Sequence, residues 1–254
     1  MAGNPPKPPN IRGVDATHTR SYRLRYQRYL AWVFDRFMEE ALPMVDHVLS
    51  FNKSPGQLDA LKRQLDVFTA AGSLRERFGN DVTREITSSY TLGRRMAADN
   101  PRIKKTPSII IPYELSRRDK MVVQDLITRN LSQLGKDLDT MKGEILRRLT
   151  DGIKEGQGIQ EIARGIRESV DGMSKSRSEM IARTETAYSY NNATAEAYKQ
   201  AGVDAWQWVS ALGFTCCDIC QGKHGQVFQW GDEQPPEHPN CLCTMWPVFN
   251  KEAA

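Results

Sequence analysis

The sequence predicts a mainly α-helical protein in which an elongated helical N-terminal region is followed by an α+β C-terminal module with a small β-hairpin. Three observations predict this class. Apolar residues recur at three- and four-residue spacings through most of the chain before Gly202. Short alternating runs with aromatic residues follow Gly202, which is typical of strands. All five cysteines lie between Cys216 and Cys243, which indicates one local site rather than a spread disulfide framework.

Composition and charge divide the 254 residues into three regions. Residues 1–14 are rich in proline and predict a flexible arm. Residues 15–150 form the helical, basic N-terminal region, and residues 151–254 form the C-terminal module. Over residues 1–150, 26 basic residues face 17 acidic ones, net +9, whereas the remainder has 9 and 14, net −5. A basic front half is compatible with a polyanionic partner and equally with a solvated helical surface.

Hydrophobic runs are too short for a membrane protein. The apolar run at residues 109–111 falls far short of the roughly 20 residues that cross a bilayer. The N-terminus has no apolar stretch after its basic residues. We therefore expect neither a transmembrane nor a secreted protein.

In the region 15–150, stretches with helical periodicity alternate with breaks marked by Pro and Gly. Residues 100–112 contain three prolines and predict a connector with a short extended segment. The expected helices cover residues 17–49, 57–78, 80–99, 116–130 and 131–149, with the last two either separate or one broken rod.

The first expected helix combines aromatic and basic residues. Its arginines are Arg20, Arg23, Arg25 and Arg28. Such a mixture can stack on bases and bind phosphates, so these arginines are candidate contacts for DNA or a protein partner. Aromatic residues at helical spacing more often form a packing face, and we favour packing for the rings.

The C-terminal module starts with helical stretches and ends with strands. We expect a turn at 156–158, a short helix at 159–170, a turn at 171–174, and a long helix from 176 to 201 that ends at Gly202. The small residues Ala193, Ala195 and Ala197 should let another element approach this helix closely. Alternating residues at 206–209 and 227–230 predict strands.

Two short motifs in this module have the spacing of metal ligands. Cys217-Asp-Ile-Cys220 and His238-Pro-Asn-Cys241 are separated by 17 residues, and a hairpin over 222–230 would lie between them. A two-residue gap in a tight turn directs both side chains at one centre. We expect a structural, zinc-ribbon-like Zn²⁺ site with Cys217, Cys220, His238 and Cys241 as ligands, and Cys243 as the alternative to Cys241.

Other interpretations of these residues stay open. Cys216 and His224 are nearby further donors, a disulfide such as Cys216 to Cys243 is an alternative, and the thiols can also be unligated buried side chains. Four protein ligands leave no open position for water, which favours a structural over a catalytic metal.

A polar cluster lies on the long helix. Arg183, Thr184, Glu185, Asn191 and Asn192 bring polar groups among buried neighbours, where they should need partners. We favour a structural network over an active site with Glu185 as acid or base. We find no nucleophile and general base at a sequence spacing typical of a catalytic site, no phosphate-binding loop and no paired carboxylates. We therefore expect no catalytic residues and no enzyme.

The order of these motifs resembles a known family. Ile181-Ala-Arg-Thr-Glu-Thr186, Cys217-x-x-Cys220 and Pro235-Pro236-Glu-His238-Pro-Asn-Cys241-Leu-Cys243 follow one another as in the phage head-morphogenesis family, also called Mu F-like minor head proteins. The resemblance covers roughly residues 150–250. Leu242 stands where the family usually has a basic residue.

The resemblance implies a minor capsid protein of a tailed bacteriophage. It would act inside the head at the portal vertex, in head assembly and in DNA packaging or ejection, after assembly in the host cytoplasm. Implied partners are the phage portal protein, major capsid or scaffolding protein, and double-stranded DNA, with no membrane. The alternatives are a transferase or nuclease-like enzyme using Arg183 and Glu185, or a zinc-ribbon nucleic-acid-binding protein, against which the acidic module argues.

Overall fold

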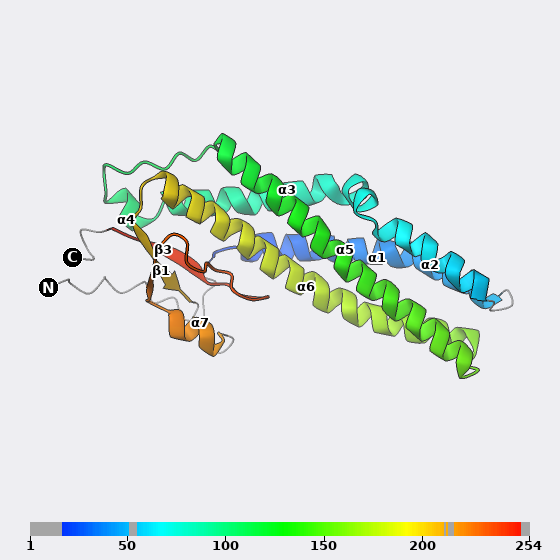
Figure 1. The fold of residues 1–254 in the computed structure, drawn as a ribbon. Coiled ribbons are helices and arrows are strands. Elements are labelled where there is room, and N and C mark those ends of the chain that lie inside the picture. The colour runs from blue at the N-terminus through cyan, green and yellow to red at the C-terminus, as the bar shows by residue number, and fades with distance from the viewer. Residues whose placement is uncertain (1–16, 51–54, 211, 213–215, 250–254) are drawn as a thin grey trace. The chain divides into compact units, whose positions relative to one another are not determined.

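The computed structural model describes residues 17–50, 55–210, 212 and 216–249 (Figure 1). Its helices are α1 (Arg20–Ser50), α2 (Pro55–Thr69), α3 (Ala71–Ala98), α4 (Pro101–Lys104), α5 (Arg117–Lys154), α6 (Ile159–Gln200) and α7 (Asp218–Lys223). Its strands are β1 (Ala205–Val209), β2 (Val227–Phe228) and β3 (Thr244–Val248). The mainly helical prediction with a small C-terminal β structure is confirmed. The predicted arm at 1–14 lies outside the described residues.

The chain forms two compact units, each assembled from segments that are separate in sequence. Unit 1 contains the described residues within 1–24, 83–127 and 182–254, and unit 2 contains residues 25–82 and 128–181. Residue 150, the sequence-based boundary, lies inside α5. Within the described part of the chain, no helix is long and apolar enough to cross a membrane.

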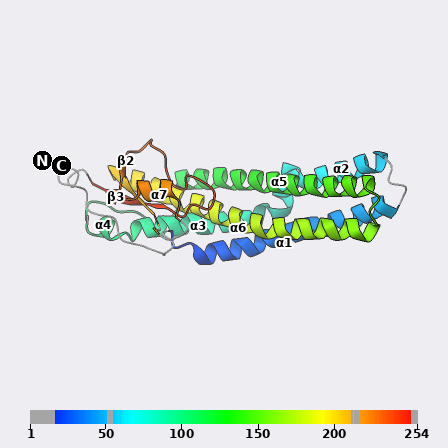
Figure 2. The same cartoon turned by 90° about the horizontal axis from the view of Figure 1, so that it is seen from below.

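In its described residues, unit 2 contains helices and the turns between them but no strand. The buried side chains of its α1 segment recur every three or four residues, so one face of the helix enters the core: Tyr26, Leu30, Val33, Phe34, Phe37, Met38, Ala41, Val45, Val48 and Leu49. The α5 and α6 segments of this unit run side by side (Figure 2). Hydrogen bonds join them, from Ser169 Oγ to Glu144 at 2.7 Å and in the Arg177–Asp137 pair at 3.0 Å.

Two breaks that the sequence predicts in helices are absent, because buried side chains continue along the same helix face through them. α5 is one helix across the expected 130/131 break, and α6 runs through the turn expected at 171–174. Val170, Ser174 and Ser178 keep a buried face in register across Gly172. A glycine costs a helix only about 1 kcal/mol relative to alanine, which such burial outweighs. The expected turn at 156–158 is confirmed, with Gly156 at φ 72°.

The break between the second and third helices is displaced from its predicted position. The sequence predicted it at residue 79, whereas α2 ends at Thr69 and α3 begins at Ala71. Gly79 and Asn80 are typical helix-ending residues. Phe78 and Val82 are both buried one turn apart, however, so the helix continues between them.

Unit 1 contains a close approach of α3 to α6. A Cβ atom at Gly93 would lie 2.2 Å from the carbonyl oxygen of Tyr190. Two α6 hydroxyls donate to α3 carbonyls: Ser189 Oγ to Ile86 O at 3.0 Å and Thr194 Oγ1 to Gly93 O at 3.4 Å. Small residues therefore set the distance between the two helix backbones.

The connector between α3 and α5 begins with a helical turn, which the sequence did not predict. Asn100 caps α4, its side chain accepting the Arg102 N–H at 3.0 Å, and Pro101 occupies the first helical position. The Asn100 amide also donates to the Tyr198 hydroxyl at 3.2 Å. Residues 109–111 form no strand.

A buried ion pair organises the polar core of unit 1. Asp119 accepts hydrogen bonds from Tyr90 at 2.8 Å and from Arg94 at 3.0 Å, and its side chain is fully buried. It also accepts the N–H and hydroxyl of Ser116, forming a capping box at the start of α5. The Arg94 guanidinium further binds Pro112 O and Gln200 Oε1. One side chain thus joins α3, the connector, α5 and α6.

The sheet of unit 1 has the strand order β2-β1-β3, with both pairs antiparallel. The sequence predicted a hairpin within 222–230, but β2 pairs with β1, so that Trp206 faces Phe228. The outer edge of β3 is contacted by α4, since Arg102 Nη1 donates to Pro247 O at 2.6 Å. All five residues of β1 are buried, so both faces of the central strand are covered.

Aromatic side chains on β1 and β2 join the sheet to α6. Trp206 and Trp208 are fully buried, and the Trp206 ring stacks on Phe228 at 4.8 Å. The same cluster includes Ala195 and Ala197, as well as Cys220, Cys241 and Cys243. The small α6 residues therefore permit close packing as predicted, and the cysteines belong to the core on which this module is built.

Candidate metal centre

The first knuckle sits at the start of α7. Cys217 caps the helix with an extended backbone, and its Sγ accepts the N–H of Cys220 at 3.4 Å. Both sulfurs therefore lie at the same helix end, one fixed by the cap and the other by the first turn. This is the local reason why the C-x-x-C spacing brings two thiols together.

The second knuckle is a tight turn closed by the Cys241 N–H, which donates to His238 O at 3.2 Å. Asn240 adopts a left-handed backbone, φ 67°, which asparagine tolerates better than most residues. His238 Nδ1 lies 2.8 Å from Pro239 O. A carbonyl can only accept, so Nδ1 carries the proton and Nε2 of the neutral ring is left with a lone pair.

That lone pair faces the first knuckle. His238 Nε2 lies 3.2 Å from Cys217 Sγ and 3.3 Å from Cys220 Sγ, and Cys220 Sγ lies 3.8 Å from Cys241 Sγ. Ligand atoms around a tetrahedral Zn²⁺ are separated by about 3.8 Å for two sulfurs and about 3.5 Å for sulfur and nitrogen. Cys217, Cys220 and His238 are mutually close donors of suitable type, so these three could hold an ion, and Cys241 adjoins them through Cys220.

A fifth donor lies beside this group. Cys220 belongs to two sets of mutually close donors, one with Cys217 and His238 and the other with Cys241 and Cys243. The Cys243 thiol also donates to Ser210 Oγ at 3.5 Å. All five described cysteines are free thiols, so the structure contains no Cys216–Cys243 disulfide.

The other two candidate donors play different parts. His224 Nδ1 accepts the N–H of Ser210 at 3.1 Å and lies outside both donor sets. Cys216 lines the cavity of about 50 Å³ at the centre. Ser210 itself was missed by the sequence analysis: its hydroxyl donates to Cys220 O at 2.5 Å and so positions the first knuckle. A lone serine gives no spacing signal from which this contact could have been predicted.

Hydrogen bonding prepares one thiol in each knuckle for metal binding. The N–H of Cys220 lowers the pKa of Cys217, and a hydrogen bond with Cys243 lowers the pKa of Cys241 to about 5. Burial raises the pKa of Cys220. Thiolates are the metal-binding form, and a divalent cation would offset the burial of Cys220 by its charge.

The long helix holds the second knuckle in place. Thr184 Oγ1 accepts the Asn240 N–H at 3.1 Å, and Arg183 Nη2 donates to Asn240 O at 3.3 Å. Further along α6, Asn191 Nδ2 donates to Cys243 O at 3.0 Å. Three of the five polar residues singled out from the sequence thus contact the metal-binding module through its backbone.

The other two polar residues of that set have different surroundings. Glu185 is buried, with 2% of its surface exposed. Asn192 Nδ2 donates to the Tyr188 carbonyl at 2.8 Å, one turn earlier on the same helix. The structure therefore joins Arg183, Thr184 and Asn191 to the centre, while Asn192 bonds within α6.

The four candidate arginines of α1 are divided between the units. Arg20 and Arg23 belong to unit 1, and Arg25 and Arg28 to unit 2. Arg20, Arg25 and Arg28 are exposed, whereas Arg23 is partly buried. None of the four lines the metal centre.

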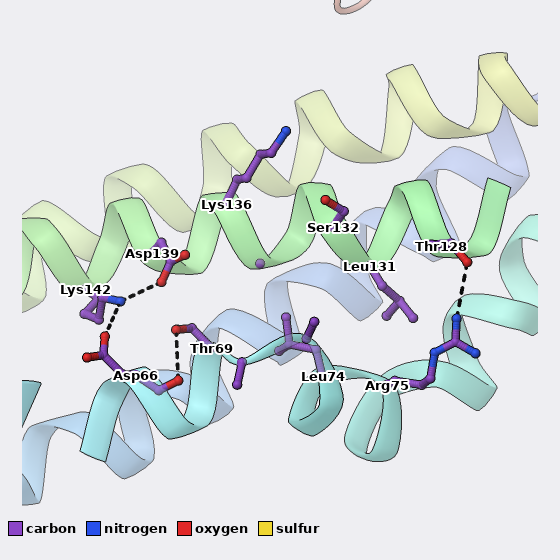
Figure 3. A pocket seen from close by; sticks show the side chains of 13 residues that line it. Asp66, Thr69, Leu74, Arg75, Thr128, Leu131, Ser132, Lys136, Asp139 and Lys142 are labelled. Atoms are coloured by element: carbon purple, nitrogen blue, oxygen red, sulfur yellow. Dashed lines mark hydrogen bonds and ion pairs between the residues drawn. The ribbon is translucent and has the colours of Figure 1, made fainter. Parts of the chain in front are cut away.

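Unit 2 has a larger hollow of about 540 Å³ beside the break between α2 and α3 (Figure 3). Several charged groups that line it contact other side chains of the same unit. Lys142 Nζ contacts both Asp66 and Asp139 at 2.6 Å, and Arg75 donates to Thr128 at 3.2 Å. None of the residues predicted from the sequence as site residues lines it.

Comparison with known proteins supports the motif analysis. Residues 143–246 match the family of phage Mu protein F like proteins. No curated protein and no solved structure matches the chain. The matched region includes both knuckles and the α6 residues that contact them, so the resemblance is confirmed for this region. The match indicates a bacteriophage head-morphogenesis protein associated with the virion.

Proposed function

We propose, from the family match over residues 143–246, that this protein is a minor head protein of a tailed bacteriophage acting inside the capsid at the portal vertex. Its role would be in head assembly and in DNA packaging or ejection. The portal protein is the proposed main partner, with major capsid or scaffolding protein and double-stranded DNA as further proposed partners.

Location is the first property to test. In infected cells, the chain should co-purify with procapsids and mature particles, and crosslinking should join it to the portal protein. Protease added to intact particles should leave it uncut, whereas opened particles should lose it, because an interior protein is shielded by the shell. Digestion in intact particles, or recovery only from the soluble cell fraction, would contradict the proposal.

The centre is proposed to hold a structural Zn²⁺ through Cys217, Cys220, His238 and Cys241. The mutual closeness of Cys217, Cys220 and His238 supports these three ligands, and the 3.8 Å between the Cys220 and Cys241 sulfurs supports Cys241 as the fourth. Cys243 is left as a protonated thiol bonded to Ser210. Zinc would link the two knuckles and so fix the loop between β1 and β3, and four protein ligands leave no position for a substrate.

Metal analysis tests this assignment. The purified chain should contain close to one zinc, and Cys217→Ser and His238→Ala should each lose it together with thermal stability, because binding and folding of such a module are coupled. Cys216→Ser is the matched control and should keep the metal. Zinc loss in Cys243→Ser with retention in Cys241→Ser would assign the fourth ligand to Cys243. A metal-free wild-type chain would contradict the site.

The surroundings of Arg183 and Thr184 favour a structural role over the enzymatic alternative. Both side chains bind the backbone of Asn240: Arg183 binds its carbonyl oxygen and Thr184 accepts its N–H. Their polar atoms thus support the turn that presents His238 and Cys241. We assign no catalytic role to these residues.

A further inference from the structure

A row of aromatic rings in unit 2 ends at the surface. Tyr26 is buried and its hydroxyl donates to Asn130, Tyr29 stacks on Tyr26 at 6.2 Å, and Trp32 stacks on Tyr29 at 5.9 Å. Phe78 contacts the Trp32 ring edge-on at 6.2 Å. Two neighbouring rings therefore fix the orientation of Trp32, yet 48% of its surface is exposed. Only a few large apolar side chains of the described unit are left open in this way.

Arginines lie on the same side of α1 as this ring. In a helix with 3.6 residues per turn, Arg25, Trp32 and Arg36 fall within about 40° of one another, and Arg28 within about 60° of Arg25. All three arginines are exposed, and the Arg36 guanidinium lies 6.0 Å from the centre of the Trp32 ring. Arg28 and Arg36 each lie about 6 Å from Trp32 along the helix axis. We call Arg25, Arg28, Trp32 and Arg36 the Trp32 surface.

We propose that the Trp32 surface binds single-stranded nucleic acid, with a base stacked on Trp32 and neighbouring phosphates bound by the arginines. A fixed, half-exposed indole flanked by guanidinium groups has the two elements of sequence-tolerant single-strand binding, a stacking platform and cations for the backbone. The bases of a duplex are already stacked on each other, so a duplex can use only the cations. This inference goes beyond the proposed head function and depends on neither the metal nor the location.

The pattern of exposed groups favours nucleic acid over a protein partner. The large apolar side chains exposed on α1 are Leu24 and Trp32, and those exposed elsewhere in the described part of unit 2, Val67 and Ile159, lie on two other helices. A stable protein interface needs about 800 Å² from each partner with an apolar centre, whereas one base needs one flat ring.

Local carboxylates reduce the positive charge without removing it. Arg36 pairs with Glu39 at 2.7 Å, but both side chains are more than half exposed. Such an exposed pair contributes little in water, so a phosphate can replace Glu39. Asp35 is also exposed on this turn.

The stacking part of the inference is tested by titrating the full-length chain into fluorescein-labelled oligothymidylate and following anisotropy. Trp32→Ala should weaken binding by about 5- to 150-fold, the range found for losing one base–aromatic stack, and Trp32→Phe should recover part of it. Tyr113→Ala, which removes a half-exposed ring from unit 1, is the control and should bind like wild type. Equal binding by wild type and Trp32→Ala would overturn the proposal, as would absence of binding by wild type, the result expected of a protein-docking surface.

The charge part uses a matched pair of double variants. Arg25→Gln/Arg28→Gln should lower the slope of log affinity against log salt by about 1.4, since each phosphate contact to a single strand contributes about 0.7. Arg164→Gln/Arg167→Gln changes two exposed arginines at the same spacing on α6 and should leave the slope unchanged. A duplex of the same length should bind more weakly and be insensitive to Trp32→Ala. Equal slopes in the two double variants, or a duplex that binds as tightly as the single strand, would contradict the site.

Discussion

Replacing Asp119 by alanine is expected to destabilise unit 1 by about 3–5 kcal/mol, the usual cost of removing one partner of a buried ion pair. The substitution leaves the Arg94 guanidinium, 2% exposed, without its counter-charge. It also removes the acceptor for the Tyr90 hydroxyl and one half of the capping box with Ser116. Burial and the hydrogen bond to Asp119 already raise the pKa of Tyr90, so the phenol stays protonated and needs an acceptor.

Urea unfolding followed by tryptophan fluorescence measures this loss. Trp206, Trp208, Trp230 and Trp246 lie in unit 1, so a Trp32→Phe background makes the signal specific to that unit. The double variant Arg94→Met/Asp119→Leu is the informative control. It should be more stable than Asp119→Ala, because apolar side chains leave no unpaired buried charge. If Asp119→Ala lowered the free energy of unfolding by less than about 1 kcal/mol, the ion pair would behave like a solvent-exposed one, which would contradict the prediction.

Gly93→Ala is expected to destabilise unit 1 by about 2–3 kcal/mol, although alanine is the better helix former by about 1 kcal/mol. The new methyl group would lie 2.2 Å from Tyr190 O and 2.9 Å from Tyr190 C and Cα. These are backbone atoms, which cannot rotate away as a flexible side chain can. The helices α3 and α6 must therefore separate, and the Thr194 hydroxyl would lose its contact with Gly93 O.

Gly79→Ala on the same helix is the control for Gly93→Ala. Its Cβ would meet Arg75 Cγ at 3.6 Å, an ordinary van der Waals distance, so this variant should be neutral or stabilised by up to about 1 kcal/mol. Thermal unfolding by circular dichroism compares the two substitutions under identical conditions. A Gly93→Ala variant as stable as Gly79→Ala would show that the helices tolerate a wider separation.

The sequence predicted that the Cys and His donors lie close together, because part of the signal is local. Two intervening residues in a short turn bring Cys217 near Cys220 and place His238 and Cys241 in one turn, and the spacing alone indicates both. The convergence of the knuckles on one point depends on α6. Thr184 and Arg183 bind the Asn240 peptide groups, and Ser210 binds Cys220 O. Contacts between residues that are distant in sequence have no spacing signal.

Helix boundaries were predicted less well, for a related reason. The glycines at positions 79, 152 and 172 resemble helix ends in the sequence, yet each lies inside a helix. Local preference favours a break by about 1 kcal/mol per glycine. Burial of a neighbouring Leu, Ile or Val side chain contributes more than that. The core therefore decided where α3, α5 and α6 continue.

The charge division in the sequence also acquires a different meaning in the structure. The basic stretch 83–127 and the acidic stretch 182–254 belong to the same unit. Arg118 on α5 pairs with Glu196 on α6 at 2.5 Å, so opposite charges from the two halves of the chain meet within it. Part of the basic excess of the front half thus serves internal packing.

By itself, the sequence determined the helical class, the ligand-type residues of the two knuckles and the family of residues 143–246, because periodicity and short spacings are properties of neighbouring residues. Only the tertiary structure decided the grouping of helix segments into two units, the Arg94–Asp119 pair and the presence of Trp32 at the end of a ring stack. Those features depend on which faces of distant segments are buried together, and burial is a property of the packed chain.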